Sequence, residues 1–280
     1  MPLKSQLSDV YYHLLPSSLL SFSLSETKMD CENCSMSRPQ HRGRYPYQKN
    51  LKCCTFQPFL PNFLVGKILQ SQLPSADVVK HKILNDDFAL PIGIIPSFSF
   101  QQQFNNKSLG EFGNRADWLC PYYNREQQNC GIWQYRGTVC TSFVCKSSYG
   151  AKGLKFWESL SNYLHYVEMA LMEESLVYLD FSPRQTNEML ALLNNKERDH
   201  WTAAEDKKYW NGYHQDKIAF YIKCAQFVDK MTKKDFKILL GQQGQQLWKA
   251  LQQAQEGIKN NDHRKPYSKF KSKIQPISQL

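Results

Sequence analysis

The sequence lacks the apolar run that a membrane-spanning helix requires. No segment of its 280 residues approaches the roughly 18 consecutive apolar residues of a transmembrane helix, so we exclude a membrane-spanning protein. Hydrophobic residues make up 41% and charged residues 21% of the chain, which is the composition of an ordinary globular protein. This composition also excludes a disordered chain, a collagen and a coiled-coil rod.

The chain also lacks the motifs of several common enzyme classes. It has no glycine-rich phosphate loop, no H-E-x-x-H zinc motif, no G-x-S-x-G nucleophile elbow and no C-x3-C-x2-C radical S-adenosylmethionine motif. No two of the seven histidines are three or four residues apart. Glu168, Glu173 and Glu174 are expected on the solvated face of a helix, so no carboxylate pair is indicated for acid–base chemistry. Whether the protein is an enzyme is left open.

The excess of positive over negative charge is concentrated in two places. The formal net charge is +10, of which residues 259–280 contribute +5 and residues 31–54 contribute +4. A nucleic-acid-binding domain would instead carry its charge along one folded face. The C-terminal segment interleaves Tyr267 and Phe270 with lysines, as single-strand binders do. Nucleic-acid binding through this basic tail, which we expect to be disordered, is therefore an alternative.

The first 30 residues do not have the pattern of an export signal. The moderately apolar stretch Val10–Leu24 is interrupted by His13 and Pro16, and no small-residue cleavage site follows it. We expect this stretch to form a short element that packs on the domain, with Phe22 buried. Without export the protein would be cytoplasmic, where disulfides are rare and clustered thiols indicate metal binding.

The first half of the chain combines short helices with irregular segments. A helix is predicted from Pro61 to Leu69, and a second one with Ser75 as its N-cap and Val78 on its apolar side. The alternation of serine and phenylalanine over residues 97–100 predicts a strand. Residues 108–150 are rich in glycine, cysteine and aromatic residues, which indicates irregular structure with short strands.

The second half of the chain has the periodicity of helices. Apolar residues at helical spacing predict one long amphipathic helix over residues 153–179. The dipeptide Ser182-Pro183 predicts the cap and the first turn of the next helix. Further helices are predicted over residues 218–231, after Thr232, and around residues 247–251.

These elements predict a predominantly α protein of the α+β class. An irregular, cysteine-rich, metal-binding half with short strands (residues 1–150) is expected to pack on a helical half (residues 151–258), followed by the basic tail (residues 259–280). No glycine-, serine- or proline-rich linker separates the halves, so we expect one body rather than two independent domains.

Eight of the nine cysteines lie in polar, irregular segments of the first half. They are Cys31, Cys34, Cys53, Cys54, Cys120, Cys130, Cys140 and Cys145. The C-x2-C spacing lets two sulfurs face one metal, whereas the adjacent Cys53 and Cys54 should diverge, so that at most one of them easily points into a given site. Free buried thiols and disulfides are the alternatives. Cys224 lies among apolar helix residues and is expected in the core.

The number of thiols fits several metal centres. Eight thiolates suit two four-cysteine zinc sites, one or two iron–sulfur clusters such as a 4Fe–4S cluster, or one cluster with several buried thiols. Ligation by cysteine alone is compatible with both zinc and iron–sulfur. His41, inside the cysteine loop, is the one histidine that is a candidate ligand.

The residues around the later cysteines form a specific run. Cys-Pro-Tyr-Tyr at 120–123 and Cys-Gly-Ile-Trp at 130–133 precede Arg136, Cys140 and Cys145, and the C-x2-C and Cys-Cys pairs stand before them. This order resembles the bacterial zinc- or iron-chelating cysteine-cluster (YkgJ-like) family, although Gly137 replaces its usual proline and relaxes the turn before Cys140. The resemblance implies an oxygen-sensitive metal centre, iron–sulfur before zinc, and no defined reaction. Some distant relatives are protein-lysine methylases, so a cluster-containing methyltransferase-like enzyme is an alternative.

Arg136 stands between two candidate ligands, Cys130 and Cys140. A centre held by four thiolates carries net negative charge, which a guanidinium would offset; an ordinary surface ion pair is the alternative.

The leading hypothesis is a cytoplasmic metal-binding protein with a structural, redox or metal-handling role and an unspecified protein partner. A zinc-organised module that binds nucleic acid through its tail is the third reading.

Overall fold

The N-terminal arm consists of short helical turns that pack on the body of the protein. The computed structural model describes residues 3–24, 26, 31, 34–38, 45–194 and 200–259. The arm contains η1 (Leu3–Gln6), η2 (Asp9–Tyr11) and α1 (Ser17–Leu20). Leu19, Phe22 and Leu24 are buried in the main core, so the predicted packing of this stretch is confirmed.

A small sheet and two helices follow the cysteine loop. They are η3 (Lys52–Thr55), β1 (Leu60–Pro61), α2 (Asn62–Gln70), α3 (Ser75–Leu84), β2 (Ala89–Leu90) and β3 (Gly93–Ile94). β3 is the middle strand and pairs antiparallel with both β1 and β2. Asn62, the first residue of α2, donates side-chain hydrogen bonds to the carbonyls of Pro91 and Met172, which joins the sheet to the long helix of the second half.

Three predictions about this region are wrong. Ser75 does not cap α3; it is the first residue of the helix, and its hydroxyl donates to the carbonyl of Gly131 at 2.7 Å. Val78 is 36% exposed and so lies off the buried side of α3. The segment expected as a strand is the helix α4 (Phe98–Asn105), because the Ser97 hydroxyl accepts a hydrogen bond from the backbone N–H of Phe100 and starts a helix.

Residues 106–149 form short elements, as the sequence predicts. They are η4 (Ala116–Trp118), β4 (Tyr123–Asn124), β5 (Asn129–Cys130), η5 (Trp133–Tyr135) and α5 (Thr138–Ser142). β4 and β5 form a two-stranded antiparallel hairpin in which Cys130 lies opposite Tyr123.

Helices dominate the rest of the described chain. They are α6 (Gly150–Tyr178), α7 (Pro183–Leu190), η6 (Ala191–Asn194), α8 (Ala203–Tyr209), α9 (Lys217–Lys230) and α10 (Lys233–Lys259). The cap at Ser182 is confirmed by a capping box with Gln185. α8 was not predicted. The backbone of Gly241 is non-helical within α10, with φ of 54°, and it separates the two helices expected there.

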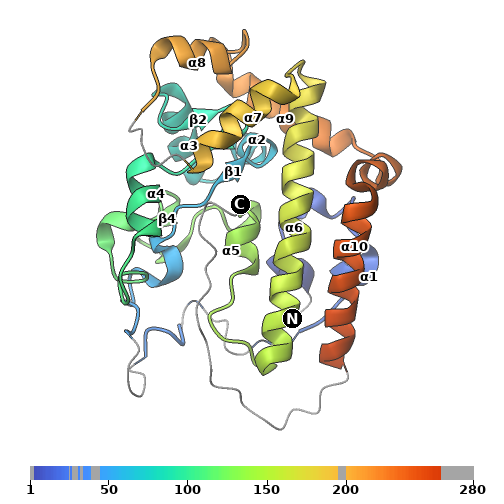
Figure 1. The fold of residues 1–280 in the computed structure, drawn as a ribbon. Coiled ribbons are helices and arrows are strands. Elements are labelled where there is room, and N and C mark those ends of the chain that lie inside the picture. Colours follow the sequence, from blue (N-terminus) through green and yellow to red (C-terminus); the bar gives the residue numbers. More distant parts are fainter. Residues whose placement is uncertain are drawn as a thin grey trace.

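One hydrophobic core joins both halves of the chain. It runs from Leu3 to Ile258 in sequence. α2 packs on α9, and α6 packs on α5 and lies side by side with α10 (Figure 1). The structure therefore confirms the predominantly α, α+β fold class. Within the described ranges, none of the helices is both long and apolar enough to cross a membrane.

Candidate functional site

Eight cysteines from separate stretches of the chain line one cavity of about 160 Å³. They are Cys31, Cys34, Cys53, Cys54, Cys120, Cys130, Cys140 and Cys145. This volume exceeds the roughly 10–15 Å³ that a cavity needs to hold one water molecule. The cavity can thus hold a group of several atoms. Cys224 is separate from it, fully buried in α9 as predicted for a core residue.

The β4–β5 hairpin fixes one wall of the cavity. Cys130 lies in β5, and the next residue, Gly131, donates its backbone N–H to the carbonyl of Tyr122 at 2.9 Å. A Cβ atom at Gly131 would lie 2.8 Å from that carbonyl oxygen, so the close approach requires glycine. The hydroxyl of Ser75 holds the same turn against the start of α3.

The adjacent pair Cys53 and Cys54 both face the cavity, contrary to the expectation that they diverge. Lys52 has φ of 54°, in the left-handed region that non-glycine residues rarely adopt, and it begins the tight turn η3. Cys53 is hydrogen-bonded to the thiol of Cys54, and this bond and burial raise the pKa of Cys53 well above its usual value. The carbonyl of Cys54 accepts the backbone N–H of Cys120 at 2.8 Å, which ties η3 to the hairpin.

The remaining thiols of the hairpin and of α5 are also held in their neutral form. Burial raises the pKa values of Cys120, Cys130 and Cys140. Hydrogen bonds from the backbone at Tyr122 and Ile132 oppose this effect at Cys120 and Cys130, because they favour the thiolate. Without a cation these sulfurs stay protonated, and a bound metal ion would displace the protons.

Cys145 and the C-x2-C pair complete the cysteine lining of the cavity. Burial, together with the nearby Cys53 and Cys34 sulfurs, raises the pKa of Cys145 to about 12. Cys31 is exposed at the rim. The carbonyl of Cys34 accepts the backbone N–H of Ser37 at 3.0 Å, which closes a turn after the second cysteine.

Two buried cations, Lys52 and Arg136, line the same cavity, each with 8% of its surface exposed. Lys52 Nζ donates to the carbonyl of Gln128 at 3.0 Å. In the part of the chain that the structure describes, neither cation forms an ion pair with a carboxylate. Buried charges require compensation, and the thiols are the groups beside them that can become anionic.

Arg136 connects three parts of the site. Its guanidinium donates to the carbonyls of Trp133 (3.1 Å), Cys140 (3.4 Å) and Gln6 (3.1 Å), and it lies 3.4 Å from the centre of the Trp133 ring. It is therefore not in the surface ion pair considered as the alternative. The next residue, Gly137, has φ of −65°, the angle that proline imposes, so the glycine has not relaxed this turn.

Glu168 is buried behind the cavity, so the expectation that it faces solvent is wrong. Only 5% of its surface is exposed. Its carboxylate accepts hydrogen bonds from the Tyr11 hydroxyl and, at 3.0 Å, from the backbone N–H of Thr138, two residues before Cys140. Burial raises the pKa of Glu168 to about 7, and the two donors partly oppose this shift. Its position one turn after the buried Leu164 was the signal that sequence analysis missed.

Aromatic side chains cover the cavity on the side of α4. A second, smaller apolar cluster contains Phe56, Phe100, Phe104 and Trp118, with Phe112 packed against it. Phe56 and Phe112 also line the cysteine cavity. This cluster therefore separates the thiols from solvent on that side.

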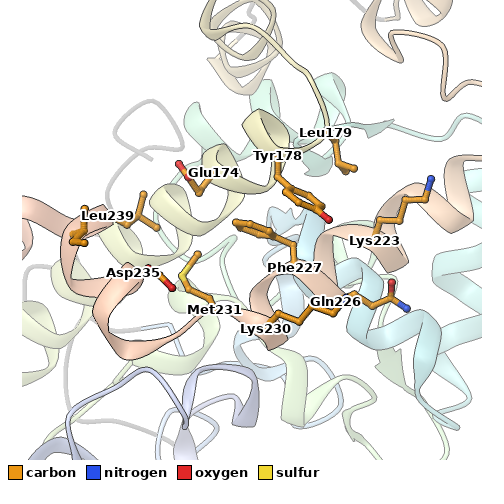
Figure 2. Close-up of a pocket in the computed structure, with 11 residues that line it drawn as sticks. Glu174, Tyr178, Leu179, Lys223, Gln226, Phe227, Lys230, Met231, Asp235 and Leu239 are labelled. Atoms are coloured by element: carbon orange, nitrogen blue, oxygen red, sulfur yellow. The ribbon is translucent and has the colours of Figure 1, made fainter.

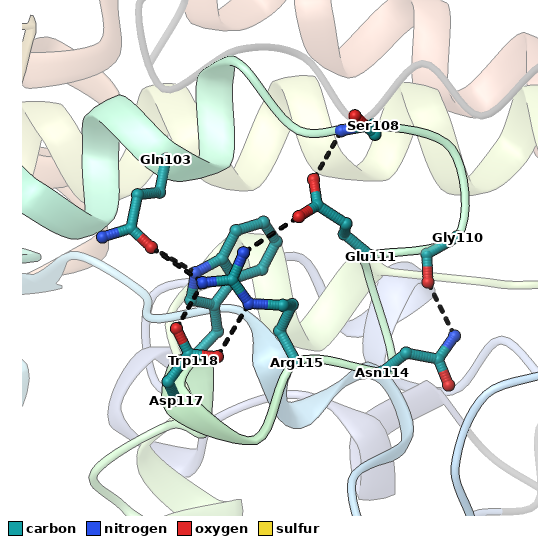
Figure 3. A network of polar contacts seen from close by, with 8 residues as sticks. All are labelled: Gln103, Ser108, Gly110, Glu111, Asn114, Arg115, Asp117 and Trp118. Atoms are coloured by element: carbon teal, nitrogen blue, oxygen red, sulfur yellow. Dashed lines mark hydrogen bonds and ion pairs between the residues drawn. The ribbon is translucent and has the colours of Figure 1, made fainter.

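A polar network holds the loop that carries this aromatic cover (Figure 3). Arg115 donates to Glu111 at 2.9 Å and to Asp117, and its guanidinium lies over the Trp118 ring. The indole N–H of Trp118 donates to Gln103 at 2.9 Å, which links the loop back to α4.

The donor set fits a thiolate-bound group in type and number. Zinc and iron–sulfur clusters prefer sulfur ligands, whereas magnesium and calcium prefer oxygen. Over the described residues, no three Cys, His, Asp or Glu side chains stand together as ligands of one metal ion, so the sulfurs line the walls without converging. His41 and residues 260–280 of the basic tail lie outside the described residues.

A second hollow, of about 870 Å³, lies between the end of α6, α9 and the start of α10. Figure 2 shows Tyr178 and Phe227 at its centre, and their rings stack with centroids 4.7 Å apart. Lys223 and Lys230 lie on its α9 wall. Its lining contains no cysteine, histidine or serine, and the one sulfur in it is the thioether of Met231.

The cysteine cavity thus contains the eight cysteines and Arg136 that the sequence nominated for the site, while the candidate ligand His41 lies outside the described residues. Lys52 and Glu168 were not nominated. Lys52 stands next to Cys53, and its place in the cysteine-rich loop was the only signal for it.

Comparison with protein families, with curated proteins and with solved structures finds no match to this chain.

Proposed function

We propose that the protein binds a thiolate-ligated metal centre, an iron–sulfur cluster or zinc, in the cavity between η3, the β4–β5 hairpin and α5. One observation carries the proposal: eight of nine cysteines, spread over more than 100 residues, line the same cavity. Cysteines that merely filled the core would be distributed among apolar neighbours, as Cys224 is. The resemblance to the cysteine-cluster family supports the same function.

Charge balance supports this proposal. Among the described residues, a site of neutral thiols would leave Lys52 and Arg136 buried without a carboxylate as counter-charge. Thiolates bound to zinc or to a cluster carry net negative charge, which the two cations offset. Arg136 lies in the electrostatic field of Cys130 and Cys140 in particular, where the negative charge would develop.

The surroundings of the cavity favour a redox-active cluster over a structural zinc ion. Its volume suits a group of several atoms, and Phe56, Phe112 and Tyr122 on its walls limit contact with water. Solvent exposure and hydrogen bonds to the sulfurs are the factors by which a protein sets the potential of an iron–sulfur cluster. A cytoplasmic location belongs to the same proposal, because a reducing compartment keeps clustered thiols available as metal ligands.

Two alternatives stay predictions. A methyltransferase-like enzyme requires a methyl-donor cleft beside the cysteines, and the larger hollow is built from α6, α9 and α10 instead. A nucleic-acid module depends on residues 260–280, outside the described part of the chain.

The test is metal analysis of the full chain purified without oxygen. Iron, acid-labile sulfide and zinc are measured per chain, together with the absorption spectrum. Visible absorption with iron and sulfide supports the cluster, and whole-number zinc without iron assigns a structural site. A folded, colourless, metal-free protein overturns the proposal. Cys224→Ala is the matched control, since it removes a cysteine outside the cavity and should leave the metal content unchanged.

A further inference from the structure

Apolar side chains are exposed around the second hollow, which lies between the end of α6, α9 and the start of α10. Tyr178 is 60% exposed, its neighbour Val177 53% and Ile238 68%. They are three of the eight large apolar side chains that are exposed in the described part of the chain. Exposed apolar residues that gather in one place mark a surface that another molecule covers.

The course of α10 creates this surface. The hydroxyl of Thr232 accepts the backbone N–H of Asp235 at 3.2 Å, so α10 begins directly after α9 ends. At Gly241 the backbone leaves the helical conformation. Residues 233–240 therefore form a short helix of their own beside α9, and Ile238 is exposed on it.

The hollow has charges of both signs, on opposite sides of an aromatic centre. Figure 2 shows Tyr178 and Phe227 in the middle of it. Glu174 and Asp235 lie on one side of these rings, and Lys223 lies on the other. Among the described residues, none of these three charged side chains forms an ion pair. All three can therefore form ion pairs with a bound molecule.

This arrangement of charges is complementary to itself. In a contact between two copies related by a two-fold axis, the same patch of both copies is used, and residue pairs occur twice. If the axis runs between the acidic and the basic side, Glu174 of each copy faces the partner's Lys223. The aromatic rings then lie at the centre of the contact, where apolar side chains contribute most to binding.

A partner with charge of a single sign fits this surface less well. An acidic peptide would meet Glu174 and Asp235, and a basic one would meet Lys223. Like charges placed opposite each other in an interface disfavour binding. A second copy avoids this repulsion on both sides of the hollow at once.

We infer that this hollow is the docking surface for a second copy of the chain. Ile238 lies three residues after Asp235 on the same helix, and thus on the acidic side of the hollow. In the dimer it packs on the partner's Tyr178 and the partner's Phe227. The inference goes beyond the proposed function and does not depend on a bound metal.

The dimer is expected to be weak. Eleven residues line the hollow, about half of the roughly 20–30 residues that each side of a standard interface contributes. Smaller contacts than this standard are typical of transient complexes. We expect a dissociation constant of about 10–100 μM.

Sedimentation equilibrium of the full chain tests this inference, with a thiol reductant present to exclude intermolecular disulfides. The intact chain should pass from monomer to dimer between about 5 and 500 μM. Ile238→Ser should weaken the dimer about tenfold, and circular dichroism should show an unchanged fold because Ile238 is exposed. Leu109→Ser, which removes an exposed leucine far along the chain from the hollow, is the matched control and should dimerise like the intact chain.

Two results of this measurement contradict the inference. One is a chain that stays monomeric over the whole concentration range, which would leave the hollow to another kind of partner. The other is an Ile238→Ser protein that dimerises as tightly as the intact chain, which would place the contact elsewhere.

Charge reversal tests which residues face each other. Glu174→Lys alone and Lys223→Glu alone each bring like charges together, so each should weaken the dimer about tenfold. An equal mixture of the two variants should dimerise again, because every reversed side chain then meets an opposite charge on the partner. Lys152→Glu, at the exposed start of α6, is the control and should leave the dimer unchanged.

A mixture that dimerises no better than the separate variants overturns the inference. Because the two variants are on different chains, recovery in the mixture cannot come from a contact within one chain. The measurement does not depend on metal content, so its failure would leave the proposed function untouched.

Discussion

The carboxylate of Glu168 accepts a 3.0 Å hydrogen bond from the backbone N–H of Thr138, the first residue of α5. The long helix α6 thereby holds the short helix that carries Cys140. The contact is fully buried, and burial raises the pKa of Glu168 to about 7. Glu168 is a positioning residue, since it reaches the thiols only through α5.

Replacing Glu168 with glutamine should remove a pH dependence of stability. Because its pKa is raised on folding, the folded protein keeps a proton between pH 4.5 and about 7 that the unfolded chain releases. The free energy of unfolding should therefore fall as the pH rises through this window. The shift corresponds to about 3 kcal/mol. Urea denaturation from pH 4 to 8 should show this loss in the intact chain relative to Glu168→Gln.

Glu158→Gln is the control for this experiment, because Glu158 lies on the same helix but is exposed. Its pH profile should match that of the intact chain. Parallel profiles for the intact chain and Glu168→Gln would show that the buried carboxyl does not change its protonation on folding.

Arg136→Gln should weaken both the fold and the metal site. The guanidinium satisfies the carbonyls of Trp133, Cys140 and Gln6, and an unsatisfied buried acceptor costs about 1–3 kcal/mol. We expect a loss of about 2–4 kcal/mol in the free energy of unfolding, because water can reach part of the site. The metal content per chain should also fall, because the variant lacks the positive charge that offsets the metal-bound thiolates. Denaturant melts and metal analysis measure the two effects.

Arg136→Lys separates charge from geometry. Lysine keeps the positive charge but cannot donate to three carbonyls in fixed directions. It should lower the stability while retaining more metal than Arg136→Gln does. Equal metal content in the two variants would mean that Arg136 acts only by bracing the backbone.

Much of the fold could be predicted because its signals are local. The helix α6 follows from apolar residues at helical spacing, and α7 from the cap at Ser182. Residues 97–100 misled the prediction because the pattern Ser-Phe-Ser-Phe has the period of a strand. Ser97 as a cap, and the packing of Phe100 on Phe104, decide for a helix. In this segment the N-cap and the tertiary contacts produce a helix despite the short strand-like alternation of polar and apolar residues.

The sequence predicts which cysteines form the site, but not the residues that hold them in place. The order of cysteines indicates a shared site without any knowledge of the fold. The spacing of Glu168 from Leu164 indicates burial but not the role of its carboxylate, because its partners Tyr11 and Thr138 lie 157 and 30 residues away. Lys52 was read only as part of the charge of its loop, whereas its left-handed backbone and burial appear only in three dimensions.

The last prediction concerns a close contact between helices α2 and α9. α2 and α9 cross at Gly66, where a Cβ atom would lie 2.0 Å from the carbonyl oxygen of Tyr221. The oxygen belongs to the main chain and the position of a Cβ atom is fixed by the backbone, so neither can move aside as the end of a flexible side chain would. Overpacking a core costs about 1–3 kcal/mol where side chains can adjust. We therefore expect Gly66→Ala to lower the free energy of unfolding by about 3 kcal/mol or more in urea denaturation.

Gly257→Ala is the matched control for Gly66→Ala. Gly257 lies in α10, and nothing is within 4 Å of the position that its Cβ would take. Alanine is favoured over glycine within a helix by about 1 kcal/mol, so this variant should be more stable than the intact chain. Opposite signs for the same chemical change would show that the contact with Tyr221, and not helix propensity, sets the cost at Gly66. A Gly66→Ala protein as stable as Gly257→Ala would mean that α2 and α9 are not packed this closely.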